Sequence, residues 1–180
     1  MTTHLNLDAL APGGRRFDSK HFRSALGQFP TGVTVITTRT TDGRRIGLTA
    51  NSFSSLSMDP PLILWSLAKP SPSMADFVAT THFAINMLAD DQQHLSRTFS
   101  TASADKFAGV PCVDGTGGVP LIDGSAAHFV CRNVGQYDGG DHLIFIGGVE
   151  EYESFGRAPL VFHAGAYRVV SPHPHPHPHI

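Results

Sequence analysis

A run of small polar side chains between two apolar stretches carries the chemistry that this sequence offers most clearly. Residues 46–48 and residues 62–65 are apolar. The polar residues between them are Thr49, Asn51, Ser52, Ser54, Ser55 and Ser57. Such a run either presents hydroxyl and backbone groups to a polar ligand or forms a serine-rich loop that satisfies its own backbone. These residues alone leave both interpretations open.

One lysine and two serines follow the second apolar stretch and precede a predicted helix. Lys69, Ser71 and Ser73 lead into a helix that carries Met74 and Phe77. Backbone N–H groups at a helix start, together with a lysine and hydroxyls, suit a phosphate. If the strand after the polar run returns past it, the hydroxyl, amide and backbone groups of the run face a flat heterocycle. The segment from Lys69 to Ser73 then faces a phosphate. That arrangement suits FMN or the matching half of FAD, although Lys69 by itself is better explained as a solvated surface lysine.

Other familiar kinds of site lack their patterns here. The histidines before the C-terminal segment show no HExxH spacing, and no serine lies in a GxSxG elbow. Neither a GxGxxG turn nor a Walker loop is present. We therefore expect no metal site in the folded part. Residues 171–180 alternate proline with four histidines that could capture a soft divalent metal, but we expect a disordered tail.

Short strands and helices must position these residues. The strands are expected at 33–38, 46–48, 62–65, 83–88, 127–134, 142–152, 160–162 and 166–170. The helices are expected after Asp18, after Pro72 and after Asp90 or Asp91, the first with an apolar face of Phe22, Leu26 and Phe29. Residues 49–57, 109–124 and 136–141 are expected to be loops. Without a βαβ rhythm, this order predicts a mainly β fold, an antiparallel barrel with short helices at its ends.

Composition limits the class of protein. The chain has 180 residues and a formal net charge of −2, which fits one domain and favours neither nucleic acid nor an anionic membrane as a partner. No apolar run approaches the ~20 residues that span a bilayer. Cys112 and Cys131 lack metal-ligand spacing, and we expect two buried thiols in a reducing cytoplasm. We predict a mobile arm over residues 1–16, a folded domain over 17–170 and the His-Pro tail over 171–180.

Several linked motifs resemble one known family. They are FRSALGQFPTGVTVITT, GLTANSFSSLSMDPPL, FAINML, DKFAGV, GGDHLIFIGGVE and PLVFHAGAY, in this order over residues 22–170. The chain resembles the short-chain flavin reductases, which supply two-component flavin monooxygenases. The resemblance implies an FMN-binding split β-barrel of Greek-key type, a homodimer and NAD(P)H:flavin oxidoreductase activity.

The same resemblance implies roles for individual residues. It places the flavin ring at Gly47, Leu48, Thr49, Asn51 and Ser52. It places the ribityl phosphate at Ser66, Leu67, Ala68, Lys69 and Ser73. Further flavin contacts are implied at Thr98 and Phe99, across the dimer if it forms. The nicotinamide side is implied at Asp141, His142, Phe162, His163, Ala164 and Gly165, with His142 as the catalytic candidate. For His142, the alternative is a strand-end histidine bonded to Asp141.

The implied reaction passes hydride from NADH or NADPH to FMN or FAD and delivers reduced flavin to a partner monooxygenase. The sequence decides neither the flavin nor the nicotinamide, and it does not identify the partner. Two alternatives remain: a flavin-binding module without catalysis, and a split-barrel flavoprotein oxidase with its own substrate.

Overall fold

The computed structural model describes residues 18–174, which form a mainly β fold with short helices. The α-helices are α1 (Ser19–Leu26), α2 (Met74–Ala79) and α3 (Gln93–Ser100). The strands are β1 (Thr31–Gly32), β2 (Thr34–Arg39), β3 (Arg45–Ala50), β4 (Ser54–Met58), β5 (Pro61–Ala68), β6 (His82–Met87), β7 (Cys112–Asp114), β8 (Pro120–Ile122), β9 (Ala127–Gly139), β10 (His142–Ser154), β11 (Val161–His163) and β12 (Ala166–Arg168). The predicted arm and residues 175–180 of the predicted tail lie outside the described residues.

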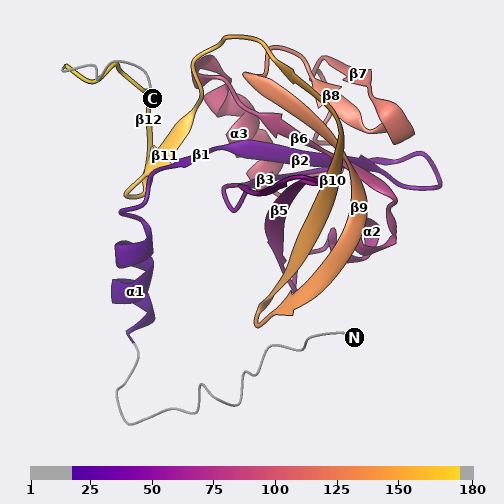
Figure 1. Cartoon of the computed structure of the whole chain (residues 1–180), viewed down its shortest axis with the longest axis horizontal. Coiled ribbons are helices and arrows are strands. Elements are labelled where there is room, and N and C mark those ends of the chain that lie inside the picture. Colours follow the sequence, from indigo (N-terminus) through magenta and orange to yellow (C-terminus); the bar gives the residue numbers. More distant parts are fainter. Residues whose placement is uncertain (1–17, 175–180) are drawn as a thin grey trace.

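One curved antiparallel sheet forms the body of the molecule (Figure 1). Its strand order is β3-β2-β6-β9-β10-β5-β4, so the hydrogen-bonded ladder is open between β3 and β4. Ser52 lies in that gap, where its Oγ donates to the carbonyl of Ser66 on β5 and accepts from the Ser66 N–H at 3.0 Å. The predicted mainly β class is therefore confirmed, and the barrel is split rather than closed by hydrogen bonds among the described residues.

The core packs around Trp65 on β5. The Trp65 ring is fully buried, stacks on Phe145 with centroids 4.6 Å apart, and meets Phe77 and Phe83 edge-on. Offset and edge-on ring pairs of this kind add to the hydrophobic gain of burying each ring. Because Phe77 comes from α2, this cluster also fixes α2 against the sheet, and so fixes the segment from Lys69 to Ser73 that leads into it.

Three predicted loops contain strands instead. Residues 54–58 of the polar run form β4, an edge strand that pairs with β5. Residues 112–114 and 120–122 form the β7–β8 hairpin inside the predicted 109–124 loop. β9 continues to residue 139, so the predicted 136–141 connection is a tight turn at residues 140–141. In each case cross-strand pairing, which has no local sequence signature, decides the state of a polar or glycine-rich stretch.

Helix α1 projects away from the sheet (Figure 1). The Asp18 carboxylate accepts hydrogen bonds from the N–H groups of Lys20 and His21, as the predicted cap requires. The predicted apolar face does not enter the core, because Leu26 is 59% exposed and Phe29 is 75% exposed. No helix within residues 18–174 has the length and apolar character needed to cross a membrane.

Candidate functional site

Two cavities that share lining residues bring together side chains predicted for the flavin and the nicotinamide. The smaller cavity, about 210 Å³, is lined by Thr49 and the larger, about 830 Å³, by His142. Asn51 and Phe162 line both of them. The polar run and the segment from Phe162 to Gly165, more than one hundred residues apart in sequence, thus meet at one place in the fold.

The smaller cavity lies between the end of β3 and helix α3. The hydroxyl of Thr49 donates to the carbonyl of Ser96 at 2.7 Å, which ties β3 to α3. The Ser96 hydroxyl in turn lies 2.9 Å from the Tyr167 hydroxyl on β12. Because the Thr49 proton is committed to Ser96, its oxygen can meet a ligand only as an acceptor.

A turn between β11 and β12 closes one side of the larger cavity. Ala164 and Gly165 both have positive φ, 48° and 80°, as the two central residues of a tight hairpin of the type I′ class require. The N–H of Ala164 donates to the carbonyl of Gly27 at 2.8 Å and so holds the end of α1 against the turn. His163 lies in β11 beside this turn, although it does not line either cavity.

The tip of the β9–β10 hairpin carries the Asp141–His142 pair. Nδ1 of His142 lies 2.6 Å from a carboxylate oxygen of Asp141, and the bond from this imidazole lowers the pKa of the Asp141 carboxyl. Nε2 of His142 has no hydrogen bond among the described residues. With Asp141 accepting the proton on Nδ1, Nε2 is left to meet a ligand. The structure thus contains the predicted Asp141–His142 bond and also places His142 on the larger cavity.

Lys69 lies beside the same hairpin tip. Its backbone N–H donates to the carbonyl of Asp141, and its ammonium lies 2.9 Å from the Asp138 carboxylate. The Lys69 side chain is 46% exposed, so this ion pair contributes little stability and can exchange for another anion. Ser73 caps α2 but makes no side-chain capping bond. The phosphate contact at Lys69 and Ser73 stays a prediction, in which a phosphate competes with Asp138.

Four of the predicted flavin residues lie in or against the core. Leu48, Leu67 and Phe99 are buried, and a Cβ added to Gly47 would lie 2.6 Å from the Phe99 ring. Their side chains are therefore packing groups beneath the site, and a ligand can reach only their backbone without displacing the core. Phe99 packs edge-on against Phe107, with ring centroids 5.0 Å apart. A side-chain contact between Phe99 and flavin would require this pair to open.

The remaining predicted residues lie near the hairpin tip or on α3. Ala68 ends β5 directly opposite His142, and Ser66 is held by Ser52 as described above. Thr98 is exposed on α3 and donates to the carbonyl of His94, outside both cavities. Its predicted flavin contact would need a second copy of the chain.

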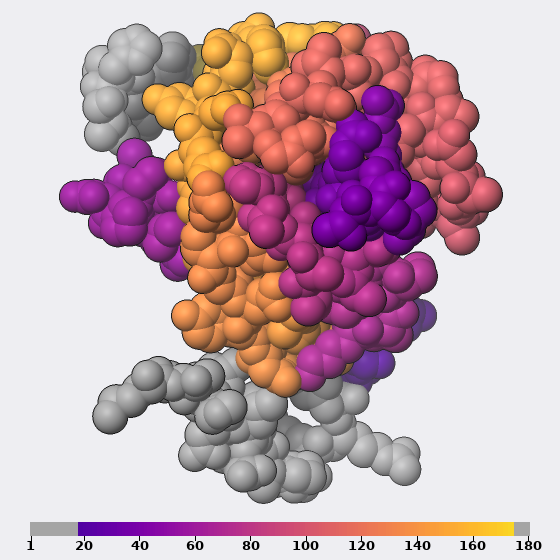
Figure 2. Space-filling model, turned by 90° about the vertical axis from the view of Figure 1, so that its right-hand side faces the viewer, coloured from indigo at the N-terminus to yellow at the C-terminus, as the bar shows by residue number. Residues whose placement is uncertain are grey.

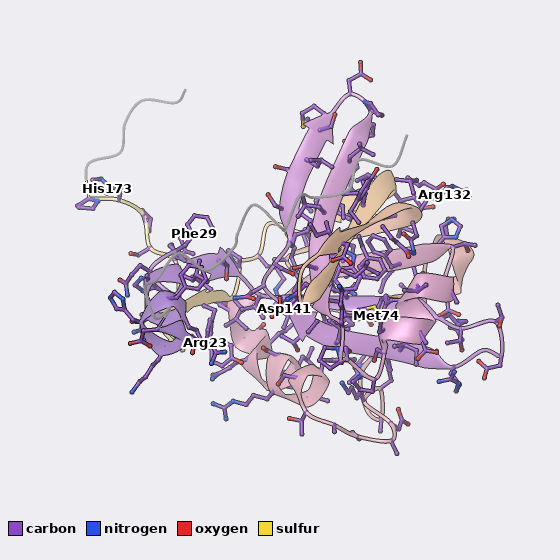
Figure 3. The ribbon with its side chains drawn as sticks, turned by 90° about the horizontal axis from the view of Figure 1, so that it is seen from below. Arg23, Phe29, Met74, Arg132, Asp141 and His173 are labelled. Atoms are coloured by element: carbon purple, nitrogen blue, oxygen red, sulfur yellow. The ribbon has the colours of Figure 1, made fainter. Side chains whose placement is uncertain are left out.

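Two basic residues of α1 line the larger cavity and were missed by the sequence interpretation. Lys20 and Arg23 share this wall with Ser24 and Gly27, at the helical spacing i, i+3, i+4 and i+7. Figure 3 shows α1 with Arg23 to the left of the turn that carries Asp141. The spacing was visible in the sequence, but nothing local indicated that α1 turns this stripe toward Asn51 and His142.

Metal ligation finds no support among the described residues, which contain no cluster of three or more His, Cys, Asp or Glu side chains suited to an ion. Both cysteines are free: Cys131 is buried, while Cys112 is only half-buried, contrary to the expectation of two buried thiols. Burial raises the pKa of the Cys131 thiol to about 12, so this thiol is unreactive near neutral pH.

A family model described as flavin reductase like domain matches residues 26–171. The reductase component of the flavin-dependent trigonelline monooxygenase of Acinetobacter baylyi is 46% identical over 148 residues, which cover 82% of this chain and 48% of that protein. The chain thus spans about half the length of that relative. The NADH-dependent FMN reductase SmoA of Agrobacterium fabrum is 44% identical over 171 residues, covering 90% of this chain and 91% of SmoA.

Solved structures show the same similarity. Component B of nitrilotriacetate monooxygenase from Mycobacterium thermoresistibile superposes with a TM-score of 0.85 at 38% identity, covering 91% of this chain and 92% of that one. The NADH:FAD oxidoreductase SgcE6 of Streptomyces globisporus, solved with NAD and FAD fragments, superposes with a TM-score of 0.83 at 36% identity, covering 90% of this chain and all of SgcE6.

Proposed function

The chain belongs to the flavin reductase like family, and on this premise we propose that it is an NAD(P)H:flavin oxidoreductase that supplies reduced flavin to a partner monooxygenase. The observation that carries the proposal is the position of Asn51. This residue lines both cavities, so the residues proposed for the flavin and those proposed for the nicotinamide converge beside it. A site of this kind brings two flat rings together, and the relatives named as NADH-dependent reductases support the reaction class.

The described residues fit a flavin and a nicotinamide because they offer hydrogen-bonding groups beside two adjoining cavities. The cofactors supply the hydride donor and the hydride acceptor, so the protein needs no strong general base. Thr49 and Asn51 offer an acceptor and an amide to the flavin ring. Nε2 of His142 would accept a hydrogen bond from the nicotinamide carboxamide, with Asp141 holding the proton of the imidazole at Nδ1. Holding both rings at near-attack distance accounts for much of the rate.

Positive charge from α1 gives the dinucleotide a second point of attachment. Lys20 and Arg23 line the same cavity as His142, and phosphate recognition by a guanidinium is strong and directional. We assign them to the phosphates of NADH or NADPH. The choice between NADH and NADPH, and between FMN and FAD, follows from the assay below.

Two further features belong to the proposal. The exposed apolar side chains Leu26 and Phe29 support a homodimer in which a second copy covers α1, and such a copy would also bring Thr98 to a flavin. The free cysteines support a reducing, cytoplasmic location.

The test is a turnover assay with a matched variant. Purified protein is mixed with NADH or NADPH and with FMN, FAD or riboflavin, and nicotinamide oxidation is followed by absorbance. We expect oxidation that depends on added flavin. If no combination of nicotinamide and flavin shows such oxidation, the chain is a flavin-binding module without catalysis. Oxidation that needs a retained flavin and an organic substrate would instead indicate an oxidase.

Asn51→Ala sharpens this test. The Asn51 side chain makes no hydrogen bond among the described residues, so its removal should leave the fold intact. We expect kcat/KM to fall about tenfold, because one ring-positioning contact worth roughly 1–1.5 kcal/mol is lost. Gln136→Ala is the control, because this exposed amide on β9 lies outside both cavities and its removal costs only a surface hydrogen bond to the Val78 carbonyl. Equal activity of the two variants would remove Asn51 from the site.

A further inference from the structure

A third cavity, of about 700 Å³, lies between the β7–β8 hairpin and the base of the β9–β10 hairpin. We call it the hairpin cavity. It shares no lining residue with the two cavities of the proposed reductase site. On the face shown in Figure 2, the salmon segment that contains β7 and β8 lies beside the yellow-orange segment that follows β10. A ligand in the hairpin cavity would therefore bind apart from the flavin and the nicotinamide.

His128 presents an unpaired acceptor to this cavity. The side chain is only 8% exposed, and its Nε2 lies 2.8 Å from the carbonyl oxygen of Ile122. A carbonyl oxygen only accepts, so Nε2 carries the proton. Burial lowers the pKa of His128, which keeps the ring neutral and leaves a lone pair on Nδ1. Within residues 18–174 no hydrogen bond reaches this Nδ1, although His128 lines the cavity.

Most of the remaining cavity wall is apolar. Leu121 on β8, Val130 on β9 and Phe155 after β10 line it, and Phe155 lies edge-on to the His128 ring with centroids 5.1 Å apart. Tyr152 lines it from β10 and is 75% exposed. A largely apolar, partly aromatic wall with a small number of polar groups is typical of small-molecule sites, and the volume falls in their usual range.

The charges around the cavity select against anions. Asp123, Glu151 and Glu153 line it, against the single cation Arg157. The Arg157 guanidinium is already engaged, because it donates to the carbonyl of Gly124 and pairs with Asp91 outside the cavity. A carboxylate or phosphate would therefore meet uncompensated negative charge.

We propose that the hairpin cavity is a binding site for a small aromatic molecule, neutral or cationic, that donates an O–H or N–H group to Nδ1 of His128. The aromatic ring packs against Phe155 and its apolar neighbours. The acidic residues at the cavity favour a cationic substituent. This inference does not depend on the reductase activity, because it uses none of the residues of that site.

Tyramine is a suitable probe, with two analogues as comparisons. Tyramine combines a phenolic donor with an ammonium group, O-methyltyramine lacks the donor, and phloretate replaces the ammonium with a carboxylate. By titration calorimetry on the full chain we expect tyramine to bind with a dissociation constant on the order of 1 mM. We expect O-methyltyramine and phloretate to bind about fivefold more weakly. Saturating FMN should leave tyramine binding unchanged.

His128→Phe tests the contact itself. Phenylalanine keeps an aromatic ring beside Phe155 and removes the Nδ1 acceptor, while the Ile122 carbonyl keeps the Ser125 hydroxyl as a donor. In this variant the fivefold difference between tyramine and O-methyltyramine should disappear. A readout without substitution is the ¹⁵N resonance of Nδ1 in the unaltered protein, which should shift as tyramine saturates the site.

A second pair of variants locates the binding. Val113→Trp fills the cavity from a position on β7 that is 56% accessible, and Val134→Trp makes the same change at a position on β9 that is 53% accessible and lies outside the cavity. We expect only the first to abolish tyramine binding. Displacement of tyramine by FMN, an unmoved Nδ1 resonance, or equal binding of the methylated analogue would each overturn the proposal. A change in oligomeric mass with Val113→Trp would also overturn it, since a second copy would then cover this cavity.

Discussion

Replacing Gly47 with alanine tests whether the floor of the proposed flavin site is set by packing. An added Cβ would lie 2.6 Å and 2.7 Å from two atoms of the Phe99 ring, and 3.1 Å from Phe107. The Phe99 ring would have to retreat by about 0.8 Å to reach an ordinary contact of 3.4 Å. It is fully buried and packed edge-on against Phe107, so it has no free space to enter. We expect the free energy of unfolding to fall by about 1–3 kcal/mol, the range for overpacked cores.

Urea unfolding measures this loss directly. The single tryptophan, Trp65, is buried in the core and reports unfolding by fluorescence. The midpoint for Gly47→Ala should fall with an unchanged slope, which marks a change in stability alone. Gly32→Ala is the matched control, because an added Cβ there meets nothing within 4 Å. Its free energy of unfolding should stay within about 0.5 kcal/mol of the unaltered protein.

A double mutant separates the clash from other causes. Phe99→Leu in the Gly47→Ala background removes the ring that the Cβ strikes. The loss in free energy of unfolding in the double mutant should therefore be smaller than the sum of the losses in the two single mutants. Flavin affinity should also fall in Gly47→Ala, because Phe99 belongs to α3, which brings Ser96 and Ser100 to the smaller cavity. If Gly47→Ala unfolds at the same urea concentration as the unaltered protein, the packing argument is wrong.

Three further predictions concern the ligands. Lys69→Ala should weaken FMN about fivefold relative to riboflavin, since an exposed charge contact that competes with Asp138 is worth about 1 kcal/mol; equal weakening of both flavins in fluorescence titrations would move the phosphate elsewhere. His142→Ala should slow hydride transfer in stopped-flow experiments while flavin affinity is kept, and the pKa of the Asp141 carboxyl should rise by NMR titration because the bond that lowers it is lost; unchanged turnover would leave His142 a structural role. Arg23→Ala should raise the KM for NADH up to about tenfold, the loss expected for one phosphate contact at an exposed site, with kcat and the KM for riboflavin unchanged. If the variant and the unaltered protein have the same KM for NADH at both low and high salt, Arg23 takes no part in dinucleotide binding.

Local sequence decided most of the strands and helices. The β-branched run at residues 34–38 predicted β2, and its buried positions confirm it. The Asp18 cap predicted α1, and the cap bonds are present. The mainly β class followed from such elements, while the linked motifs gave the family. The polar run was also visible as a candidate ligand surface, because so many hydroxyls between apolar strands are unusual for a packed sheet.

The sequence could not separate contacts from supports within that candidate site. The family resemblance assigned Leu48, Leu67 and Phe99 to the flavin in the same way as Asn51, yet their side chains are buried and that of Asn51 lines two cavities. Burial depends on which element packs above a residue, and α3 covers β3 only through long-range contacts such as the Thr49–Ser96 bond. Residue type gives no such information.

Tertiary structure alone decided what meets at the site and what lies elsewhere. Pairing of β5 with β10 sets Ala68 opposite His142, and the bond from Ala164 to Gly27 turns the Arg23 side of α1 toward the same cavity. These partners are more than seventy residues apart or lie on a helix with two plausible faces, so no local period predicts them. Pairing of β7 with β8 likewise forms the hairpin whose Ile122 carbonyl holds His128, in a stretch that the sequence predicted to be only a loop. The sequence therefore predicted most secondary-structure elements and the candidate site residues, whereas strand register and packing determined which side chains lie next to each other.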